Sequence, residues 1–322
     1  MENTNGEFTN ERLTRSKAEE LLNTMCAQEQ FYSIAVFDIL GFSNYVEKNG
    51  NQAVLDLYNK LLTLVYKPDD EKYVPVRLTD DWKYNVYLAN SNGYVRACHF
   101  SDTIIIYVNY LVHGEPYLLA TRHYEPYPLL LGKNGELCCA EFYIQHPIYL
   151  SFLQTCMDFF IYATMLGIPL RGCISSGFAT MDSNKSIYFG KPLVEAARGE
   201  PARKMLGISF GRSFNNHHPV YNDYFIPYWS YIKEDKSRFL SPMVLDWPRC
   251  LRNSLNFKKD HFYEWIKKMN IDPDYSEYYN NTIRFFDFSS EHTNWPEEIN
   301  RDGIEDILDY YQKTKIWYES VT

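Results

Sequence analysis

Residues 32–45 read YSIAVFDILGFSNY, and this stretch decides how the fold begins. Its first part is rich in β-branched and aromatic residues and is stopped by Gly41, which predicts a buried strand over residues 32–40. A helical pattern follows the glycine. The chain therefore opens with a strand and a helix, and Asp38 lies near the carboxyl end of that strand.

The period of the apolar residues and the Gly and Pro positions predict the elements that follow. Two apolar runs meet at a turn around Ser101 and Asp102, which is typical of a hairpin. In chain order we expect a helix that is interrupted near Gly50 and ends near residue 67, strands over residues 85–100 and 102–109, a helix over residues 147–167, a strand over residues 170–180, and a strand over residues 187–190 that opens into a helix over residues 191–198. The order βαββαβ predicts an α+β fold of the ferredoxin-like kind.

Three regions are expected along the chain. The main α+β domain spans residues 31–213 and carries an insertion at about residues 109–146, where prolines and a KNGE turn interrupt the pattern. A helical segment over residues 1–30 precedes the domain. Residues 214–322 follow it as a helical extension that is rich in aromatic residues.

Composition excludes several classes of protein. The formal net charge of -9 argues against a protein that binds the phosphate backbone of nucleic acid. The amino terminus has no apolar core segment, so we expect a cytoplasmic protein. Residues 148–168 are apolar, yet Gln154 and Asp158 interrupt them, which favours a buried amphipathic helix over a membrane span. Seven cysteines without any CxxC spacing make a disulfide framework or a zinc site improbable.

Two carboxylates fall where strands end, Asp38 after the first strand and Asp102 at the tip of the hairpin. In a ferredoxin-like sheet these strands are neighbours, so the two side chains can converge. Two adjacent acids repel each other unless a cation lies between them, and carboxylate oxygens suit Mg²⁺ or Mn²⁺. The alternative is that Asp38 caps the following helix and that Asp102 is only a turn residue.

Three segments together resemble the class III nucleotidyl cyclases. FDILGFSNYV at residues 37–46 looks like the first metal-binding motif of that family and its phosphate-binding turn. HFSDTIIIY at residues 99–107 resembles the second metal motif. IYFGKPLVEAAR at residues 187–198 resembles the final element, in which an Arg follows a Gly by eight positions. The three motifs keep the order of the family and span most of residues 31–211.

The resemblance implies a role for each matching residue. Asp38, Asp102 and the carbonyl of Ile39 would bind two Mn²⁺ or Mg²⁺ ions per site. The backbone amides of Gly41, Phe42 and Ser43 would hold the triphosphate, and Arg198 would stabilise charge that develops on the α-phosphate. In this family the Arg and the acids come from different subunits, so a homodimer with shared sites is implied.

The chain departs from the family at the positions that recognise the base. Cys98 and Ile187 stand where adenylate cyclases have Lys and Asp and where guanylate cyclases have Glu and Cys. Val194 replaces an Asn that orients the ribose or phosphate. A buried purine would leave its polar atoms unpaired here, so purine selectivity is poorly supported.

Class III relatives that lack the purine pair include the pyrimidine cyclases of the bacterial Pycsar antiphage defence systems, which this chain resembles in size and in its divergent base pocket. The resemblance implies conversion of UTP, or of CTP, to cUMP or cCMP and pyrophosphate. The product would act on a separate effector protein. Tyr45, Arg96 and His99 are further polar candidates for reading the base.

Three other interpretations stay open. An adenylate cyclase with atypical base contacts would keep the reaction and change the substrate. A degenerate cyclase-like module would bind a nucleotide or a protein without turnover, which the loss of the Asn at Val194 favours and the retention of both acids and Arg198 disfavours. A polymerase-like palm also pairs acids on such a sheet, but the acidic charge balance opposes a template groove.

Overall fold

A computed structural model describes most of the central part of the chain. The described residues are 30–66, 73–79, 82–87, 95–109, 147–213, 224–253, 257–269 and 272–292. The expected helical segment over residues 1–30, apart from its last residue, and nearly all of the expected insertion at 109–146 lie outside these ranges.

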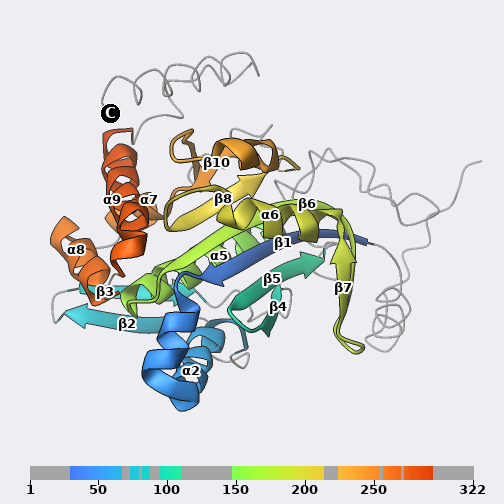
Figure 1. The fold of residues 1–322 in the computed structure, drawn as a ribbon, viewed down its shortest axis with the longest axis horizontal. Coiled ribbons are helices and arrows are strands. Elements are labelled where there is room, and N and C mark those ends of the chain that lie inside the picture. The colour runs from blue at the N-terminus through green and yellow to red at the C-terminus, as the bar shows by residue number, and fades with distance from the viewer. Residues whose placement is uncertain are drawn as a thin grey trace, which may run out of the picture.

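Apart from an unexpected pair of strands within residues 73–87, the first half of the described chain follows the expected order of elements (Figure 1). Its elements are β1 (Gln30–Ile39), α2 (Phe42–Tyr66), β4 (Val95–Phe100), β5 (Thr103–Asn109), α5 (Pro147–Met165), β6 (Leu170–Asp182), β7 (Ile187–Gly190) and α6 (Lys191–Gly199). The expected interruption of α2 is found at Gly50, whose φ of 76° departs from the helix.

One predicted strand is wrong, because residues 85–100 do not form a single element. Residues 85–87 end β3 (Trp82–Tyr87), which pairs with β2 (Tyr73–Thr79) in a separate two-stranded sheet. Only β4 pairs with β5. The sequence between the two strands, LANSNGY, contains the Asn, Ser and Gly residues that interrupt strands.

The C-terminal region does more than append helices, as was expected of residues 214–322. It contributes β9 (Phe225–Pro227) and β10 (Leu240–Leu245) to the same sheet as β1. Its helices are α7 (Trp247–Arg252), α8 (Lys259–Lys268) and α9 (Ser276–Glu291), with short 3₁₀ turns η4 (Glu234–Phe239) and η5 (Pro273–Tyr275). The earlier turn η2 (Glu200–Ala202) and strand β8 (Gly207–Gly211) lead into it.

The described residues form a mixed α+β fold around a mostly antiparallel, eight-stranded sheet. The strand order is β4-β5-β1-β6-β8-β10-β9, with β7 paired to β6. β1 lies between β5 and β6 and runs antiparallel to both, whereas β6 and β8 are parallel. This order makes the strand that carries Asp38 a direct neighbour of the strand that follows Asp102.

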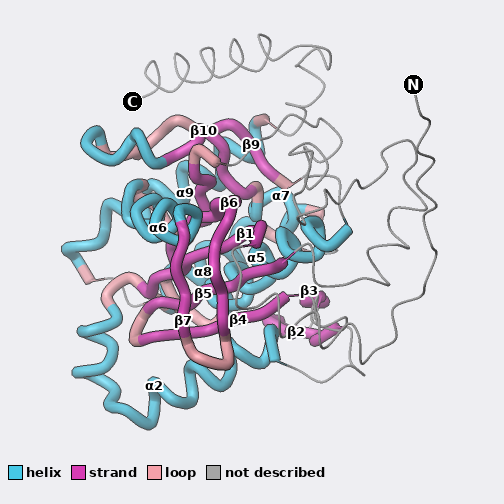
Figure 2. Tube along the Cα trace, turned by 90° about the vertical axis from the view of Figure 1, so that its right-hand side faces the viewer, coloured by secondary structure: helices cyan, strands magenta, loops and turns pink. Residues whose placement is uncertain are grey.

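The two faces of β1 enter different hydrophobic clusters, as the alternation of a strand requires. Ala35 and Phe37 pack in the large core with α5, while Ile34 and Val36 pack in a smaller cluster beneath α6. Figure 2 shows the helices on both sides of the sheet. Asp38 follows Val36 by two positions, so its side chain lies on the α6 face.

Helix α5 is buried nearly all round, rather than along a single stripe. It contacts α2, α7 and α8 as well as the sheet. Even Asp158 is buried, and it accepts a hydrogen bond from Gln154 at 2.9 Å. Among the described residues, no helix combines the length and the apolar character that crossing a bilayer would require.

Candidate functional site

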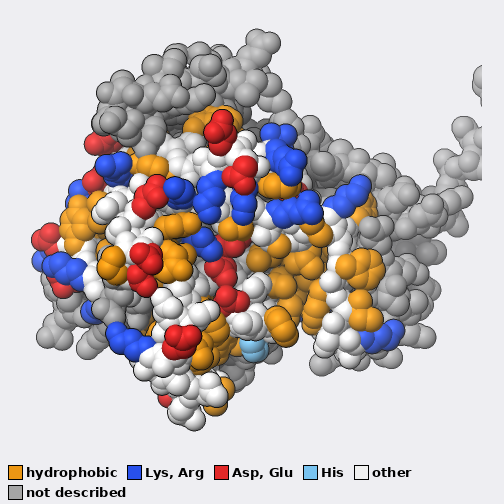
Figure 3. All heavy atoms as spheres, in the orientation of Figure 1, with side chains coloured by type: hydrophobic (Ala, Val, Ile, Leu, Met, Phe, Trp, Pro, Cys, Tyr) orange, Lys and Arg blue, Asp and Glu red, His pale blue; other side chains and the backbone are white. Residues whose placement is uncertain are grey.

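Asp38 and Asp102 lie next to each other at one end of the sheet. Asp38 pairs with Thr103 across β1 and β5, and Asp102 occupies the turn just before β5. Burial raises the pKa of Asp38, and Asp102 raises it further through its charge and through side-chain hydrogen bonding, against the opposing effect of Arg171. The two carboxyl groups are therefore close enough to interact directly. Figure 3 shows acidic side chains gathered in the middle of this face.

Arg171 is a site residue that the sequence did not single out. It lies on β6 directly opposite Asp38, and its Nη2 donates to Asp38 Oδ2 at 2.7 Å. Its Nε also lies 2.8 Å from Oε1 of Glu200, in the turn η2. We call Asp38, Asp102, Arg171 and Glu200 the acidic cluster. The only sequence signal for Arg171 was a charged residue inside an otherwise apolar strand.

Glu200 is a buried member of this cluster. Burial raises its pKa to about 7, with the charge of Arg171 opposing the rise and that of Asp38 adding to it. Burial alone would lower the pKa of Arg171, but the nearby carboxylates outweigh it and leave that pKa raised. The cluster therefore has three carboxyls and one guanidinium, which is an excess of negative charge.

The C-terminal region reaches the acidic cluster through a tyrosine. The guanidinium carbon of Arg171 lies 5.4 Å from the ring centroid of Tyr278 on α9, and Nη1 lies 3.4 Å from the Tyr278 hydroxyl. An arginine over a tyrosine ring is stabilised by cation–π attraction. Helix α9 thus helps to hold Arg171 in position against Asp38.

Helix α2 supports the turn that carries Asp102. The hydroxyl of Tyr58 donates a hydrogen bond to the carbonyl oxygen of Ser101, whose φ of 53° is in the left-handed region. Burial, together with the charges of Asp102 and Asp38, raises the pKa of Tyr58 to about 12, so the hydroxyl stays a donor at neutral pH. The Tyr58 ring also stacks on His99 at 5.3 Å.

The turn after β1 has the geometry expected of a strand-to-helix junction. Gly41 has a φ of 76°, which L-residues with a side chain adopt at a cost, and α2 begins at Phe42. Since the helix begins four residues after Asp38, that carboxylate is too early to be its N-cap. Its partner is Arg171 instead, which disfavours the capping alternative. Asp102 does lie in a turn, so the alternative that it is only a turn residue stays open.

The donor set of the site fits a hard divalent cation. Two adjacent carboxylates and the backbone carbonyl of Ile39 offer oxygen ligands of the kind that Mg²⁺ and Mn²⁺ prefer. Burial is the main cause of the raised pKa of Asp38, and the adjacent Asp102 adds to it, as expected of two acids that lie close together. Across the described ranges, no group of three or more His, Cys, Asp or Glu side chains could hold a metal. Asp38, Asp102 and backbone oxygen would therefore be the protein ligands.

The predicted arginine lies away from the two acids. Arg198 is exposed on α6, with its guanidinium carbon 5.5 Å above the ring of Phe239. Within the described chain Arg198 makes no recorded contact with Asp38 or Asp102. The structure of one chain therefore does not bring this arginine to the acids.

The base-recognition candidates are divided between the two faces of the sheet. Cys98 is half-buried on β4, and burial raises the pKa of its thiol to about 11 despite a hydrogen bond with Tyr188, a neighbour that the sequence did not single out. Ile187 and Val194 are exposed. Cys98 and its strand neighbour His99 face opposite sides, and His99 stacks on Tyr58 in its own chain. His99 therefore lies on the opposite face of β4 from Cys98.

The two remaining polar candidates are also separated. Arg96 is two positions from Cys98 on β4 and is exposed on the same face. Tyr45 packs against the large core on the other face. Only Arg96 of the three polar candidates thus shares a face with Cys98.

Comparison of the chain with protein-family models, with curated proteins and with solved structures gave no match. What the protein can do is therefore judged from the residues of the site.

Proposed function

We propose that this protein is a metal-dependent nucleotidyl cyclase whose catalytic core is a ferredoxin-like domain of the class III kind. The observation that carries the proposal is the adjacency of Asp38 and Asp102 at the end of neighbouring strands. Two adjacent carboxylates repel each other, and divalent cations bound between them would relieve that repulsion. Nucleoside triphosphates bind to proteins together with such cations, so they are the proposed class of substrate.

In the proposed reaction, the ribose 3′-oxygen attacks the α-phosphorus of the nucleotide. A bond forms between these atoms, the bond from the α-phosphorus to the bridging oxygen of pyrophosphate breaks, and the hydroxyl proton is lost to solvent. Asp38, Asp102 and the Ile39 carbonyl would hold Mn²⁺ or Mg²⁺, and the bound ions would supply the positive charge that lowers the pKa of the hydroxyl and neutralises pyrophosphate. The amides that follow Gly41 bind the triphosphate at the start of α2.

Arg171 is proposed as a positioning residue. Its bond to Asp38 fixes the orientation of one carboxylate, and its contacts with Glu200 and Tyr278 fix Arg171 itself. Preorganised ligands of this kind avoid reorganisation when charge develops during the reaction. Loss of Glu200 should therefore reduce turnover less than loss of Asp38, because Glu200 acts only through Arg171.

The exposed surface supports a homodimer with shared sites. Phe178, Ile187, Phe189 and Val194 are large apolar residues between 45% and 59% exposed, all on β6, β7 and α6. Strand alternation places Phe178, Ile187 and Phe189 on the opposite side of the sheet from Tyr188, whereas Val194 lies on α6 itself. Figure 3 shows further hydrophobic side chains gathered on the α6 face. Clusters of this kind mark interaction sites. A second chain against this face would bring its own Arg198 toward the acids, which one chain does not do.

The base site favours a pyrimidine triphosphate, UTP or CTP. Cys98 stays a protonated thiol because its pKa is about 11, and Ile187 is apolar, so neither residue offers the charged groups that read a purine edge. Tyr188, beside Cys98, can exchange hydrogen bonds with a smaller base. The cyclic product, cUMP or cCMP, would serve as a second messenger in antiphage defence and act on a separate effector.

The second candidate is a cyclase-like module that binds a nucleotide or a partner without turnover. The ion pair between Arg171 and Asp38 favours it, because that carboxylate already has a cationic partner. An adenylate cyclase with atypical base contacts is the third. These candidates differ in product, so one assay separates them.

The test is to incubate the purified chain with Mn²⁺ and each of ATP, GTP, CTP and UTP, and to identify cyclic monophosphates by mass. We expect product from UTP or CTP, and none from Asp38→Asn or Asp102→Asn. Asp260→Asn, an exposed acid on α8, is the matched control and should retain full activity. Product from ATP alone would overturn the pyrimidine assignment, and no product from any nucleotide would favour the binding module.

A further inference from the structure

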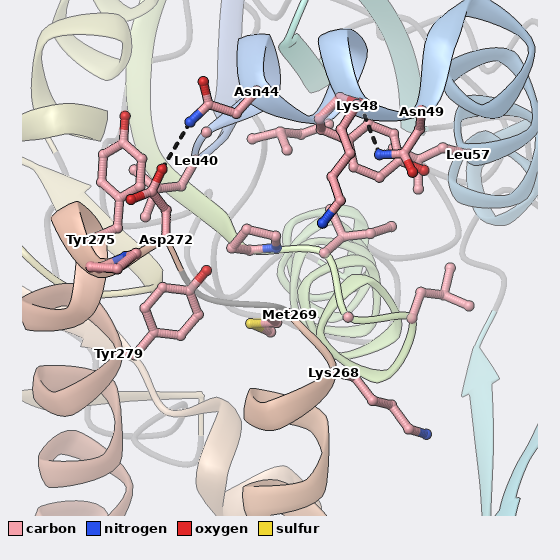
Figure 4. A pocket seen from close by; sticks show the side chains of 18 residues that line it. Leu40, Asn44, Lys48, Asn49, Leu57, Lys268, Met269, Asp272, Tyr275 and Tyr279 are labelled. Atoms are coloured by element: carbon pink, nitrogen blue, oxygen red, sulfur yellow. Dashed lines mark hydrogen bonds between the residues drawn. The ribbon is translucent and has the colours of Figure 1, made fainter.

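A cleft of about 540 Å³ lies beside the β1–α2 turn, away from the acidic pair. Its walls come from α2, from the turn between α5 and β6, and from the segment that joins α8 to α9 (Figure 4). Ile39 and Leu57 line it and belong to the large core, so the cleft is on the α5 side of the sheet. Asp38 faces the α6 side. Neither acid lines the cleft, although the backbone of Ile39 and Gly41, which the proposed metal and phosphate site also uses, forms part of its wall.

One cation points into the cleft. In Figure 4 the side chain of Lys48 extends from α2 into the hollow, whereas Lys268 points away from it. None of the ion pairs recorded between described side chains involves Lys48. Lys48 is exposed, so its ammonium group can reach an anion at the opening of the cleft.

Among the other polar groups of the lining, Tyr279 supplies a donor and Asp272 supplies a carboxylate that is already bonded. The lining also includes Asn44, Tyr45, Asn49, Lys268 and Tyr275. The hydroxyl of Tyr279 points into the cleft, and burial together with the charge of Asp272 raises its pKa to about 12, so it acts as a donor. Asp272 accepts hydrogen bonds from the Asn44 side chain at 2.9 Å and from the Asp274 amide at 3.0 Å. Asp272 therefore ties α2 to η5 and adds negative charge at that end of the cleft.

A large part of the lining is apolar. Met269 can change shape to fit a ligand, because its side chain is unbranched and polarizable. Leu166 is 39% exposed at the rim. The apolar lining includes Leu40, Leu57, Leu166, Ile168 and Met269.

We propose that this cleft binds a small monoanionic ligand with an apolar ring body. The anionic group would form an ion pair with Lys48, and the ring would pack against the apolar lining. An acceptor atom on the ring would accept a hydrogen bond from the Tyr279 hydroxyl. A single cation with a carboxylate nearby selects against polyphosphates, and the volume suits a small molecule. Since Leu40 and Gly41 form part of the wall, an occupant would touch the turn that follows Asp38.

The probe is anilinonaphthalene sulfonate, a fluorescent monoanion with aromatic rings, titrated into the full chain. We expect Lys48→Met to weaken binding about fivefold, the upper end of what an ion pair at an exposed lysine contributes. Lys60→Met, an exposed lysine on the same helix, is the matched control and should change affinity less than about twofold. Leu166→Trp should fill the rim and also weaken binding.

Two further measurements locate the probe. Neutral N-phenylnaphthylamine should bind the Lys48→Met variant as well as it binds the unmodified protein. Asp38→Asn should leave sulfonate binding unchanged, whether or not the protein is a cyclase. Equal sulfonate affinity in Lys48→Met and in the unmodified chain, or loss of binding in Asp38→Asn, would place the probe elsewhere and overturn the proposal.

Discussion

The acidic cluster and a second buried cluster, where α7 meets α9, combine the same residue types in opposite proportions. The acidic cluster has three carboxyls around one guanidinium. The second has one carboxyl, that of Asp246, beside Arg249 and Arg252. With every group ionised, the formal charge is −2 in the first and +1 in the second. The first cluster attracts cations, and the second has no need of them.

Hydrogen bonding shows the same difference. Asp246 caps α7 by accepting from the Arg249 amide at 3.2 Å, and it also accepts from the Ser289 hydroxyl. Arg252 donates to the Ser289 carbonyl at 2.7 Å. The carboxylate of the second cluster thus receives its hydrogen bonds from the protein itself, and these bonds join α7 to α9. Similar residues therefore stabilise the fold in the second cluster, whereas in the acidic cluster they leave negative charge that could bind cations.

The sharpest test of this contrast is removal of a carboxylate charge from the acidic cluster. Asp102→Asn should lower turnover about 10³-fold or more, because the cations lose a ligand, while stability stays equal or rises as repulsion with Asp38 is relieved. Product formation and urea unfolding measure the two effects. A variant that lost stability and activity together would make Asp102 a structural residue like Asp246.

The acid pair could be predicted because its geometry depends on local patterns. Strand alternation and the hairpin turn place Asp38 and Asp102 on adjacent strands, and the order βαββ is readable from the apolar period. Arg171 and Glu200 could not be predicted, because their meeting depends on the register of β6 and on a short 3₁₀ turn, which no periodicity reports.

The part of the fold that depends on distant contacts was also missed. The sequence LSPMVL of β10 lies in a tail dominated by helical patterns, and its pairing with β8 is decided by tertiary contacts. The cleft likewise exists only because η5 docks on α2 through Asp272 and Asn44, which are 228 positions apart. The residue pattern of a single sequence does not predict contacts between residues so far apart in the chain.

A substitution in the second cluster should have the largest effect on stability. Asp246→Ala leaves Arg249 and Arg252 without their carboxylate and removes the helix cap, so the free energy of unfolding should fall by about 3–5 kcal/mol. Urea unfolding measures the change. Asp260→Ala, at an exposed position of α8, is the control and should stay within about 0.5 kcal/mol of the unmodified protein. A similarly small change in Asp246→Ala would mean that the second cluster does not stabilise the fold.

A smaller, pH-dependent effect should distinguish Glu200 from the other carboxyl groups of the two clusters. Its folded pKa of about 7 lies above the ordinary value of 4.5, so the folded state binds the proton more tightly. The stability contributed by the protonated group is present below about pH 4.5 and is lost as pH rises through about 7. Glu200→Gln should abolish this loss, which amounts to at most about 3 kcal/mol. Urea unfolding of both proteins at pH 5 and pH 8, in the presence of a chelator, measures this loss. An equal change in the free energy of unfolding with pH in the two proteins would contradict a raised pKa for Glu200.

The smallest expected effect concerns the support of the Asp102 turn. Tyr58→Phe removes the hydroxyl that donates to the Ser101 carbonyl and leaves the ring stacked on His99, so stability should fall by only about 1 kcal/mol. Because the turn positions Asp102, Mn²⁺ affinity measured by calorimetry should fall a few-fold with it. In the Asp102→Asn background the same substitution should cost the same stability but no longer change the remaining Mn²⁺ affinity. An equal loss of affinity in both backgrounds would show that Tyr58 acts on the metal site without involving Asp102.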